Sequence, residues 1–342
     1  MSIHARKGAV GAGLLALTLA AILSPTRLHA ADEGSPMPTM PPKGRLVIIG
    51  GGAMNVEMRR QVLDLAGGPK IHVVALPQAS NDPKAGTLLV DRWQAAGAED
   101  ITALDLADPT KAVETVAKAD LIWIRGGSQT RLMTALKGTG VPEAIRRRFQ
   151  GGGIVAGTSA GAAVMSQMMI AGVNRRAAPM QPIMAQGLGL WPDAIVDQHF
   201  LKRNREWRLK ATVLEHPTLL GVGIDELTAV VVSGREFEVI GPSSVVVLDA
   251  RKLAEAAKAG APKPAATDKD AEVVKGPSDK DAPRDGADAK AADQKVAEHA
   301  AEKPKVADGA LEPRRFILRA GMRYHLDKGL LPPAEAAVAR EH

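Results

Sequence analysis

An alternation of strand-like apolar runs with helical stretches constrains the fold of this 342-residue chain more than any other feature of its sequence. The expected strands are 45–49, 71–76, 100–104, 120–124, 153–156 and 220–224, and the helical stretches include 56–66, 85–97, 110–118 and 142–149. Strands that alternate with helices along a chain form a parallel sheet that helices cover on both faces. The sequence therefore predicts an α/β fold with a mostly parallel sheet.

The first thirty residues have the pattern of a secretory signal peptide. Arg6 and Lys7 form a short basic region, an apolar stretch runs from about residue 9 to 23, and Leu28-His29-Ala30 resembles a small-residue cleavage site. The apolar stretch is too short for a membrane span, and no later segment reaches the required length. We expect removal of residues 1–30, no stable membrane insertion afterwards, and a periplasmic or extracellular location.

Composition divides the rest of the chain into four parts. Residues 31–43 form a Pro- and Met-rich spacer before a catalytic α/β domain at 44–252. Residues 253–311 are almost all Ala, Lys, Asp, Glu, Pro and Gly, so they cannot bury enough apolar surface to offset their chain entropy. We expect a disordered low-complexity insertion there. The last part, 312–342, returns to the catalytic domain through a strand near 314–319.

Charge and cysteine content exclude several classes of function. The formal net charge is +6, and half of it comes from three basic residues of the leader. The mature chain is therefore too nearly balanced for a nucleic-acid-binding face. With zero cysteines the chain has no disulfide and no thiol nucleophile, which excludes a true glutamine amidotransferase. We expect no metal and no cofactor.

The segment Gly157-Thr158-Ser159-Ala160-Gly161 joins a strand-like run to a small-residue segment. A serine between glycines at such a junction lies on a tight turn, which exposes its hydroxyl and directs the first helical N–H groups toward the atom that it attacks. Glycine is common in this chain, so the motif could also mark a structural turn. Both flanks favour a serine nucleophile at Ser159.

His199 is the best candidate for the base among the eight histidines, because it closes a strand-like run and precedes a polar cluster. His72 and His325 lie within strand-like segments and are weaker candidates. The orienting acid is Asp225 or Glu226, at the end of a buried strand, where α/β proteins place their chemistry. The order Ser, His, acid argues against an ordinary α/β-hydrolase, in which the acid precedes the histidine.

A second glycine cluster, Gly50-Gly51-Gly52, follows the strand at 45–49 and suggests a dinucleotide site. Asn55 stands where that fingerprint requires its third glycine. The pattern therefore argues against a Rossmann cofactor and favours a tight strand-to-helix turn with Asn55 as the N-cap.

Three spaced motifs follow one another along the chain. They are Gly157-Thr158-Ser159-Ala160-Gly161-Ala162, Asp197-Gln198-His199-Phe200 followed by Arg203, Arg205 and Arg208, and Gly223-Ile224-Asp225-Glu226. Together they resemble the cyanophycinase branch of the serine peptidases related to dipeptidase E and isoaspartyl dipeptidase. The resemblance runs from about residue 44 to 248 and returns at 315–318. It implies a triad of Ser159, His199 and Glu226, and a three-layer α/β/α sandwich similar to the class I glutamine amidotransferases.

The same resemblance implies binding residues. Residues 124–129 resemble the family's Gly-Gly-Asp-Gln loop, so the N–H groups of Gly127 and Ala160 would form an oxyanion hole. The substrate pocket would be lined by Gln129, Asp197, Gln198, Arg203, Arg205 and Arg208. Guanidinium groups suit carboxylates, although a solvated helix start also explains the arginines.

Two departures from the family pattern concern substrate recognition. Ser128 replaces the acid of the Gly-Gly-Asp-Gln loop, and residues 50–55 lack the acids of the family's Gly-Gly-Ala-Glu-Asp segment. Both departures weaken the case for recognition of a substrate guanidinium. They leave the expected hydrolytic machinery intact.

The resemblance implies a secreted serine exopeptidase that acts on cyanophycin, a poly-aspartate with arginines in isopeptide linkage. The product would be β-aspartyl-arginine, released through an acyl-enzyme. One alternative is an isoaspartyl or N-terminal-aspartyl dipeptidase for small peptides, which Ser128 favours. Another is a catalytically silent periplasmic peptide-binding protein. The sequence leaves the oligomeric state open, with a homodimer as one candidate.

Overall fold

The computed structural model of the protein describes residues 41–260 and 312–332. The predicted signal peptide (1–30), most of the predicted spacer, residues 261–311 of the predicted insertion and the chain from residue 333 lie outside the described residues. Within the described part of the chain, no helix combines the length and the apolar character needed to cross a membrane.

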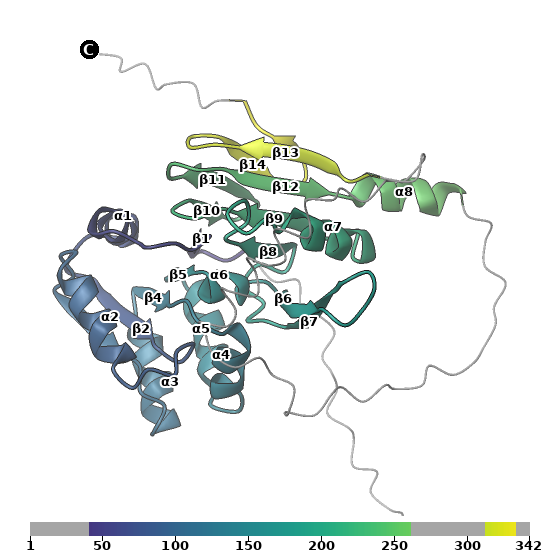
Figure 1. Cartoon of the computed structure of the whole chain (residues 1–342). Coiled ribbons are helices and arrows are strands. Elements are labelled where there is room, and N and C mark those ends of the chain that lie inside the picture. The colour runs from purple at the N-terminus through teal and green to yellow at the C-terminus, as the bar shows by residue number, and fades with distance from the viewer. Residues whose placement is uncertain (1–40, 261–311, 333–342) are drawn as a thin grey trace, which may run out of the picture. The chain divides into compact units, whose positions relative to one another are not determined.

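A nine-stranded mixed sheet forms the centre of the fold, with the strand order β15-β14-β11-β10-β1-β5-β4-β2-β3 (Figure 1). Strands β1, β5, β4, β2 and β3 are parallel, and they are the first five strands that the sequence predicts. Antiparallel strands extend the sheet beyond β1. The bounds are β1 Arg45–Ile49, β2 His72–Leu76, β3 Asp100–Ala103, β4 Leu121–Ile124, β5 Ile154–Thr158, β10 Ala229–Ser233, β11 Glu236–Ile240, β14 Arg323–His325 and β15 Gly329–Leu330.

Helices cover both faces of the parallel half of this sheet, because alternate residues of a strand point to opposite faces. In β1, Val47 and Ile49 pack in one core with α1 and α2, whereas Leu46 and Ile48 pack in another core with α3, α4 and α5. The bounds are α1 Val56–Ala66, α2 Ala85–Gln94, α3 Pro109–Lys118, α4 Gln129–Leu136, α5 Val141–Gln150 and α6 Ala160–Ala163. The predicted α/β architecture with helices on both faces is confirmed.

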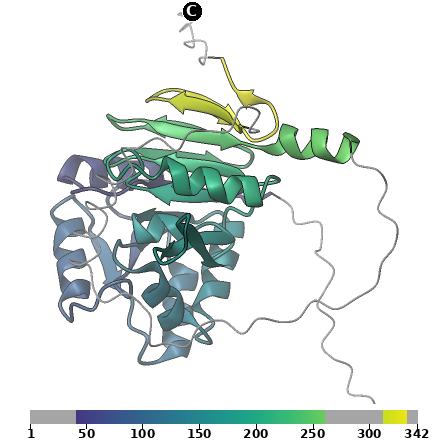
Figure 2. The same cartoon turned by 45° about the vertical axis from the view of Figure 1, so that its right-hand side comes forward.

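A second sheet has the strand order β13-β12-β9-β8 (Figure 2). One of its faces packs in the same core as the large sheet, and α7 packs on the other face. The bounds are β8 Ala194–Gln198, α7 Glu206–Glu215, β9 Leu220–Ile224, β12 Val245–Asp249 and β13 Arg314–Leu318. The sequence prediction placed the strand at 220–224 in the large sheet, whereas β9 pairs with β8 and β12. Its glycines suit this position, since a Cβ at Gly221 would lie 2.7 Å from Val213 Cγ1 and one at Gly223 would lie 2.5 Å from the Phe200 ring.

The described chain resumes at residue 312 and joins this second sheet. Strand β13 pairs antiparallel with β12, with Arg314 opposite Asp249. The start of the predicted insertion differs, because helix α8 (Arg251–Gly260) continues past residue 253. The remaining hairpin, β6 (Met168–Asn174) and β7 (Gln181–Gln186), is absent from the sequence prediction and contacts β8 and α7.

Candidate active site

Ser159 lies on the sharp turn between β5 and α6, with φ 54° and ψ −113°. Its backbone N–H donates to the Ile49 carbonyl at 3.0 Å, which fixes the turn against β1. Both glycines of the motif are required by close approaches. A Cβ at Gly157 would lie 2.6 Å from the Gly161 carbonyl oxygen, and one at Gly161 would lie 2.1 Å from the Ile124 carbonyl oxygen. The motif is therefore a strained strand-to-helix turn that presents a partly exposed serine.

His199 follows β8 and lies directly beside this serine. Its backbone also has a positive φ of 49°, and its N–H donates to the Gly50 carbonyl at 2.6 Å. The His199 Nε2 atom is 2.9 Å from Ser159 Oγ, and its Nδ1 atom is 2.6 Å from Glu226 Oε1. His199 is only 7% exposed. The structure thus brings together the serine, the histidine and one of the two acids that the sequence analysis singled out.

Asp225, the other candidate acid, has different partners. Its Oδ1 accepts a hydrogen bond from the Lys202 backbone N–H at 2.9 Å, and its Oδ2 accepts one from the Ser243 hydroxyl at 2.8 Å. Asp225 therefore ties the segment after His199 to the loop before β12. The carboxylate at the imidazole belongs to Glu226.

The glycine cluster Gly50-Gly51-Gly52 packs against His199 and Glu226. A Cβ at Gly51 (φ +112°) would lie 2.3 Å from His199 Cε1, and one at Gly52 (φ +88°) would lie 3.0 Å from Glu226 Cβ. Asn55 caps α1, as predicted, by accepting from the Met58 N–H at 2.8 Å. The sequence analysis identified the turn, but the pattern of glycines alone could not show that the His199 side chain occupies the space beside it.

The surroundings of His199 favour its neutral form. Burial lowers the pKa of the imidazole from 6.5 to about 4, and the positive charge of Arg203 adds to this effect. The hydrogen bond to Glu226 opposes the shift. A neutral imidazole that donates from Nδ1 to Glu226 has a lone pair on Nε2, which can accept the proton of the Ser159 hydroxyl.

The predicted oxyanion donors, Gly127 and Ala160, lie in the loop after β4 and in the first turn of α6. A Cβ at Gly126 would lie 3.1 Å from the Ser159 Cβ, so the loop after β4 passes directly over the turn. Gly127 has φ +146°, and a Cβ there would lie 2.2 Å from the Ala79 carbonyl oxygen, which leaves room only for glycine. The N–H of Ala160 lies in the first turn of α6, where no intrahelical carbonyl is available to it. The predicted pair of donors stays a prediction that this arrangement permits.

The two residues after Gly127 have structural partners. The Ser128 hydroxyl accepts from the Arg131 N–H at 3.2 Å and caps α4. Aspartate is an equally good N-cap, so the departure at Ser128 preserves this role. The Gln129 Nε2 donates to the carbonyls of Ile170 and Ala171 at 3.0 and 3.3 Å, and this ties the loop to β6. The amide N–H groups of Gln129 are thus directed at the hairpin, whereas the prediction assigned this residue to substrate.

Hydrogen bonds within the protein hold Arg205 and Arg208, two of the arginines that follow His199. Arg208 donates from two nitrogens to both carboxylate oxygens of Asp197, and Asp197 is 1% exposed. The Arg205 Nη1 donates to the backbone carbonyl and to the Oε1 of Gln198, at 2.8 and 2.9 Å. Gln198 Oε1 lies 3.5 Å from Ser159 Oγ. Asp197 is therefore the buried counter-ion of Arg208, too enclosed to line a substrate pocket as predicted, and Arg205 and Arg208 are not the open forks that their spacing suggested.

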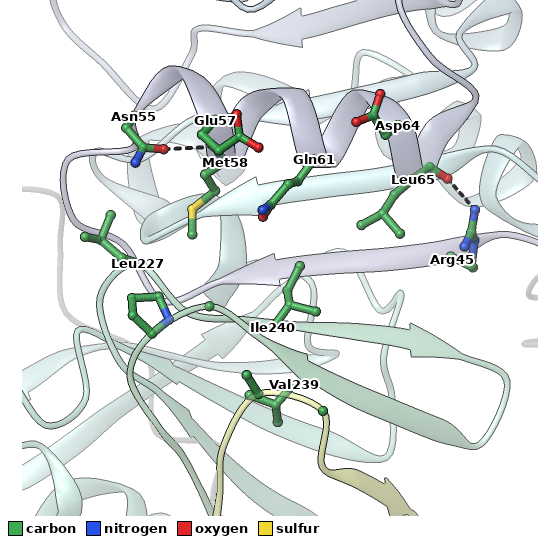
Figure 3. Close-up of a pocket in the computed structure, with 14 residues that line it drawn as sticks. Arg45, Asn55, Glu57, Met58, Gln61, Asp64, Leu65, Leu227, Val239 and Ile240 are labelled. Carbon is green, nitrogen blue, oxygen red and sulfur yellow. Dashed lines mark hydrogen bonds between the residues drawn. The ribbon is translucent and has the colours of Figure 1, made fainter. Parts of the chain in front are cut away.

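A groove of about 720 Å³ lies between α1 and the end of β11, and Ser159 is not among the residues that line it (Figure 3). Met58 and Gln61 of α1 form one wall, and Leu227 and Ile240 form the other. None of the triad candidates lines it. Glu57 and Asp64 also line it, but no serine, threonine or histidine does, so its size does not make it the site of a serine nucleophile.

Two histidines outside the site, His72 and His325, have local partners. His72 faces Asp100 at the start of β2, with 3.0 Å between Nδ1 and Oδ2, and the Nδ1 of His325 accepts from the Asp327 N–H at 3.1 Å. In the described ranges, no three His, Asp or Glu side chains gather as a group that could hold a metal ion.

A strained serine, a buried neutral histidine and a carboxylate at the ends of the strands of an α/β sheet define a serine-type hydrolase. The model of peptidase family S51 matches residues 46–240. The protein belongs to peptidase family S51 and is a serine-type peptidase.

Several relatives are cyanophycinases. The cyanophycinase of Nostoc sp. (strain PCC 7120 / SAG 25.82 / UTEX 2576) is 39% identical over 62% of this chain and 75% of its own length. That of Geminocystis herdmanii (strain PCC 6308) is 37% identical over 62% of this chain and 82% of its own. Among solved structures, a peptidase from an acI-B1 Actinobacterium aligns with a TM-score of 0.48 and 26% identity, over 60% of this chain and 91% of that one.

Proposed function

We propose that the protein is an exported serine exopeptidase that hydrolyses cyanophycin and releases β-aspartyl-arginine. The cyanophycinases that match most of the catalytic region support this substrate class. Export rests on the signal-peptide pattern of residues 1–30.

The reaction would proceed through an acyl-enzyme. Ser159 Oγ attacks the scissile carbonyl while His199 Nε2 takes the hydroxyl proton, and Glu226 stabilises the imidazolium that forms. The N–H groups of Gly127 and Ala160 bind the oxyanion. His199 then donates the proton to the leaving amine as the C–N bond breaks. In the second half, water attacks the ester, His199 accepts a proton from the water, and Ser159 leaves with that proton restored.

The observation that carries the proposal is the continuous hydrogen-bonded series Ser159 Oγ, His199 Nε2, His199 Nδ1 and Glu226 Oε1, with steps of 2.9 and 2.6 Å. Three different parts of the chain supply these side chains. A structural turn would not require a buried imidazole with a lowered pKa at the serine hydroxyl.

The direct test incubates the mature protein, residues 31–342, with cyanophycin granules and identifies the released fragments by mass spectrometry. We expect β-aspartyl-arginine, and no release by the Ser159→Ala variant. A serine-directed phosphonate should label the native protein and fail to label Ser159→Ala. Phosphonate labelling without any peptide hydrolysis would contradict the proposed activity.

Ser128 favours the alternative of an isoaspartyl dipeptidase, because the family acid is missing there. The same assay with simple isoaspartyl dipeptides distinguishes the two functions. A higher kcat/KM for these dipeptides than for cyanophycin would replace the polymer with the small peptide as the proposed substrate.

A further inference from the structure

The loop after β4 carries one of the two predicted oxyanion donors, the N–H of Gly127, and backbone hydrogen bonds anchor this loop on both sides of the donor. Before it, the Arg125 N–H donates to the Leu76 carbonyl at 3.4 Å. After it, the Ser128 N–H donates to the Ala79 carbonyl at 2.9 Å. The peptide unit that joins Gly126 to Gly127 lies between these two anchors.

This peptide unit lies beside the serine and has wide conformational freedom. A Cβ at Gly126 would lie 3.1 Å from the Ser159 Cβ. Neither glycine has a Cβ, so the backbone dihedrals on both sides of the peptide are little restricted. Because a trans peptide is planar, its carbonyl and its N–H point in opposite directions. A rotation of this plane would therefore turn the Gly127 N–H away from the oxyanion position.

The Arg125 side chain fixes the plane of this peptide. Its Nε donates to the Gly126 carbonyl at 3.2 Å. Among the described residues, no other group donates to this carbonyl and none accepts from the Gly127 N–H. A cation thus holds the carbonyl end of the peptide, and the N–H end stays available for a substrate oxygen.

The surroundings of Arg125 disfavour a cation. The side chain is half-buried. Burial lowers the pKa of its guanidinium, the positive charge of Arg92 lowers the pKa further, and Asp82 opposes both effects. An arginine keeps its charge even so. Charged groups in unfavourable surroundings are concentrated at functional sites, so this position favours a functional role for Arg125.

We propose that Arg125 is a positioning residue of this peptidase, which holds the Gly126–Gly127 peptide so that the Gly127 N–H faces the developing oxyanion. A charged donor on the carbonyl also polarises the peptide and strengthens its N–H as a donor. The inference rests on the proposed function, because it requires Ser159 as the nucleophile and Gly127 as an oxyanion donor. The sequence analysis gave Arg125 no role.

Two substitutions of Arg125 separate its hydrogen bond from its charge. In Arg125→Gln the side-chain nitrogen follows Cδ, as Nε does in arginine, so a donor stays near the Gly126 carbonyl without the charge. Arg125→Met has a chain of similar length and no donor. Arg92→Met is the matched control, because it removes a charge that acts on Arg125 and none of the described hydrogen bonds joins Arg92 to this peptide.

The first measurement is the steady-state hydrolysis of the peptide substrate. The oxyanion forms only in the transition state, so a displaced donor lowers kcat and leaves KM unchanged. We expect Arg125→Met to lower kcat about 10- to 100-fold, as for the loss of one charged hydrogen bond. Arg125→Gln should recover most of this loss, and Arg92→Met should match the native protein.

Three results would overturn the role of Arg125. The first is an Arg125→Gln variant as slow as Arg125→Met, which would mean that the bond to the Gly126 carbonyl does not matter. The second is an equal loss of kcat in Arg92→Met, and the third is a loss confined to KM.

A serine-directed phosphonate separates this inference from the proposed substrate, because its phosphoryl oxygen occupies the oxyanion position and its reaction needs no cyanophycin. The rate constant for labelling of Ser159 should fall about 10- to 100-fold in Arg125→Met and stay unchanged in Arg92→Met. Equal labelling rates in Arg125→Met and native protein overturn the role of Arg125 alone. Labelling that depends on Arg125, without hydrolysis of cyanophycin or isoaspartyl dipeptides, overturns the proposed function and supports the role of Arg125.

Discussion

At the scale of single residues, the site depends on an imidazole that stays neutral where a free histidine would be charged. The pKa of His199 is about 4, against 6.5 for the exposed group, because burial and Arg203 both disfavour the cation. The acid limb of kcat/KM should therefore fall near pH 4 and not near pH 6.5. A pH–rate profile on a neutral peptide substrate checks this, and a limb at or above pH 6.5 would contradict it.

The lowered pKa of His199 also makes the free energy of unfolding depend on pH. Between about pH 4 and 6.5 the unfolded chain binds a proton at His199 and the folded protein does not. The contribution of His199 to the free energy of unfolding is thus complete above pH 6.5 and is lost as the pH falls toward 4.

Replacing Arg203 by Gln removes a charge that disfavours the imidazolium of His199. The acid limb of kcat/KM should therefore move to higher pH in this variant, whereas Arg176→Gln should leave it unchanged.

Two adjacent acids should give different phenotypes. Glu226→Gln removes the charge that stabilises the imidazolium, so kcat should fall roughly 10²–10⁴-fold with little change in stability. Asp225→Asn alters the bonds to Lys202 and Ser243, so it should cost about 1 kcal/mol in the free energy of unfolding and less than about tenfold in kcat. Steady-state kinetics and urea unfolding measure both. A larger loss of kcat in Asp225→Asn would reverse the assignment of the acid.

At the scale of elements, the turn between β1 and α1 serves as a platform for His199. Gly51→Ala would place a Cβ 2.3 Å from the imidazole in a backbone conformation with φ +112°, and should abolish activity by displacing the ring. Gly68→Ala is the matched control, because φ is +97° there and nothing lies within 4 Å of the added Cβ. Both variants incur backbone strain of about 1–2 kcal/mol, but only Gly51→Ala should lose kcat. Full activity in Gly51→Ala would show that the turn can move to accommodate the added Cβ without displacing the imidazole.

Strand β8 and helix α7 are joined by a buried ion pair between Asp197 and Arg208. An exposed ion pair between Arg235 and Asp327 serves as its control. Arg208 binds Asp197 with side chains 8% and 1% exposed, and Arg235 binds Asp327 through two nitrogens with side chains 48% and 55% exposed. Arg208→Met removes the two-nitrogen partner of a buried carboxylate, which keeps Arg205 at 3.7 Å, and should cost up to about 3–5 kcal/mol. Arg235→Met should cost about 0–1 kcal/mol. Chemical unfolding of the two variants measures the difference, and equal costs would mean that Asp197 finds another partner.

At the scale of the whole molecule, local sequence pattern predicted the parallel half of the large sheet, and it singled out a serine, a histidine and a pair of acids whose catalytic roles stay predictions. Strands β1 to β5 alternate with helices, and that alternation is visible in the apolar runs. The position of β9 was not predictable, because an apolar run does not specify which sheet it joins. The residues alone left the acid open between Asp225 and Glu226, and only the family resemblance implied Glu226, because local sequence does not specify in which direction each of two neighbouring side chains at a strand end points. The inward orientation of Arg208 and Arg205 likewise depends on Asp197 and Gln198, which the family resemblance assigned to the substrate.

The last prediction concerns the segment between the two described parts of the chain. Helix α8 ends at Gly260 and β13 begins at Arg314, where it pairs with β12. Residues 261–311 have the composition of the predicted insertion, with few apolar side chains to bury. Replacing them with a short Gly/Ser linker keeps α8 and the β12–β13 pairing. Loop-closure entropy changes by only about 0.6 kcal/mol for each doubling of length, so the thermal midpoint and the peptidase activity should stay nearly unchanged. A variant that also lacks Arg314–Leu318 is the control, and it should unfold at a lower temperature because β12 loses its partner. A fall in the midpoint of the linker variant as large as that of the control would show that the segment contributes to the packed domain.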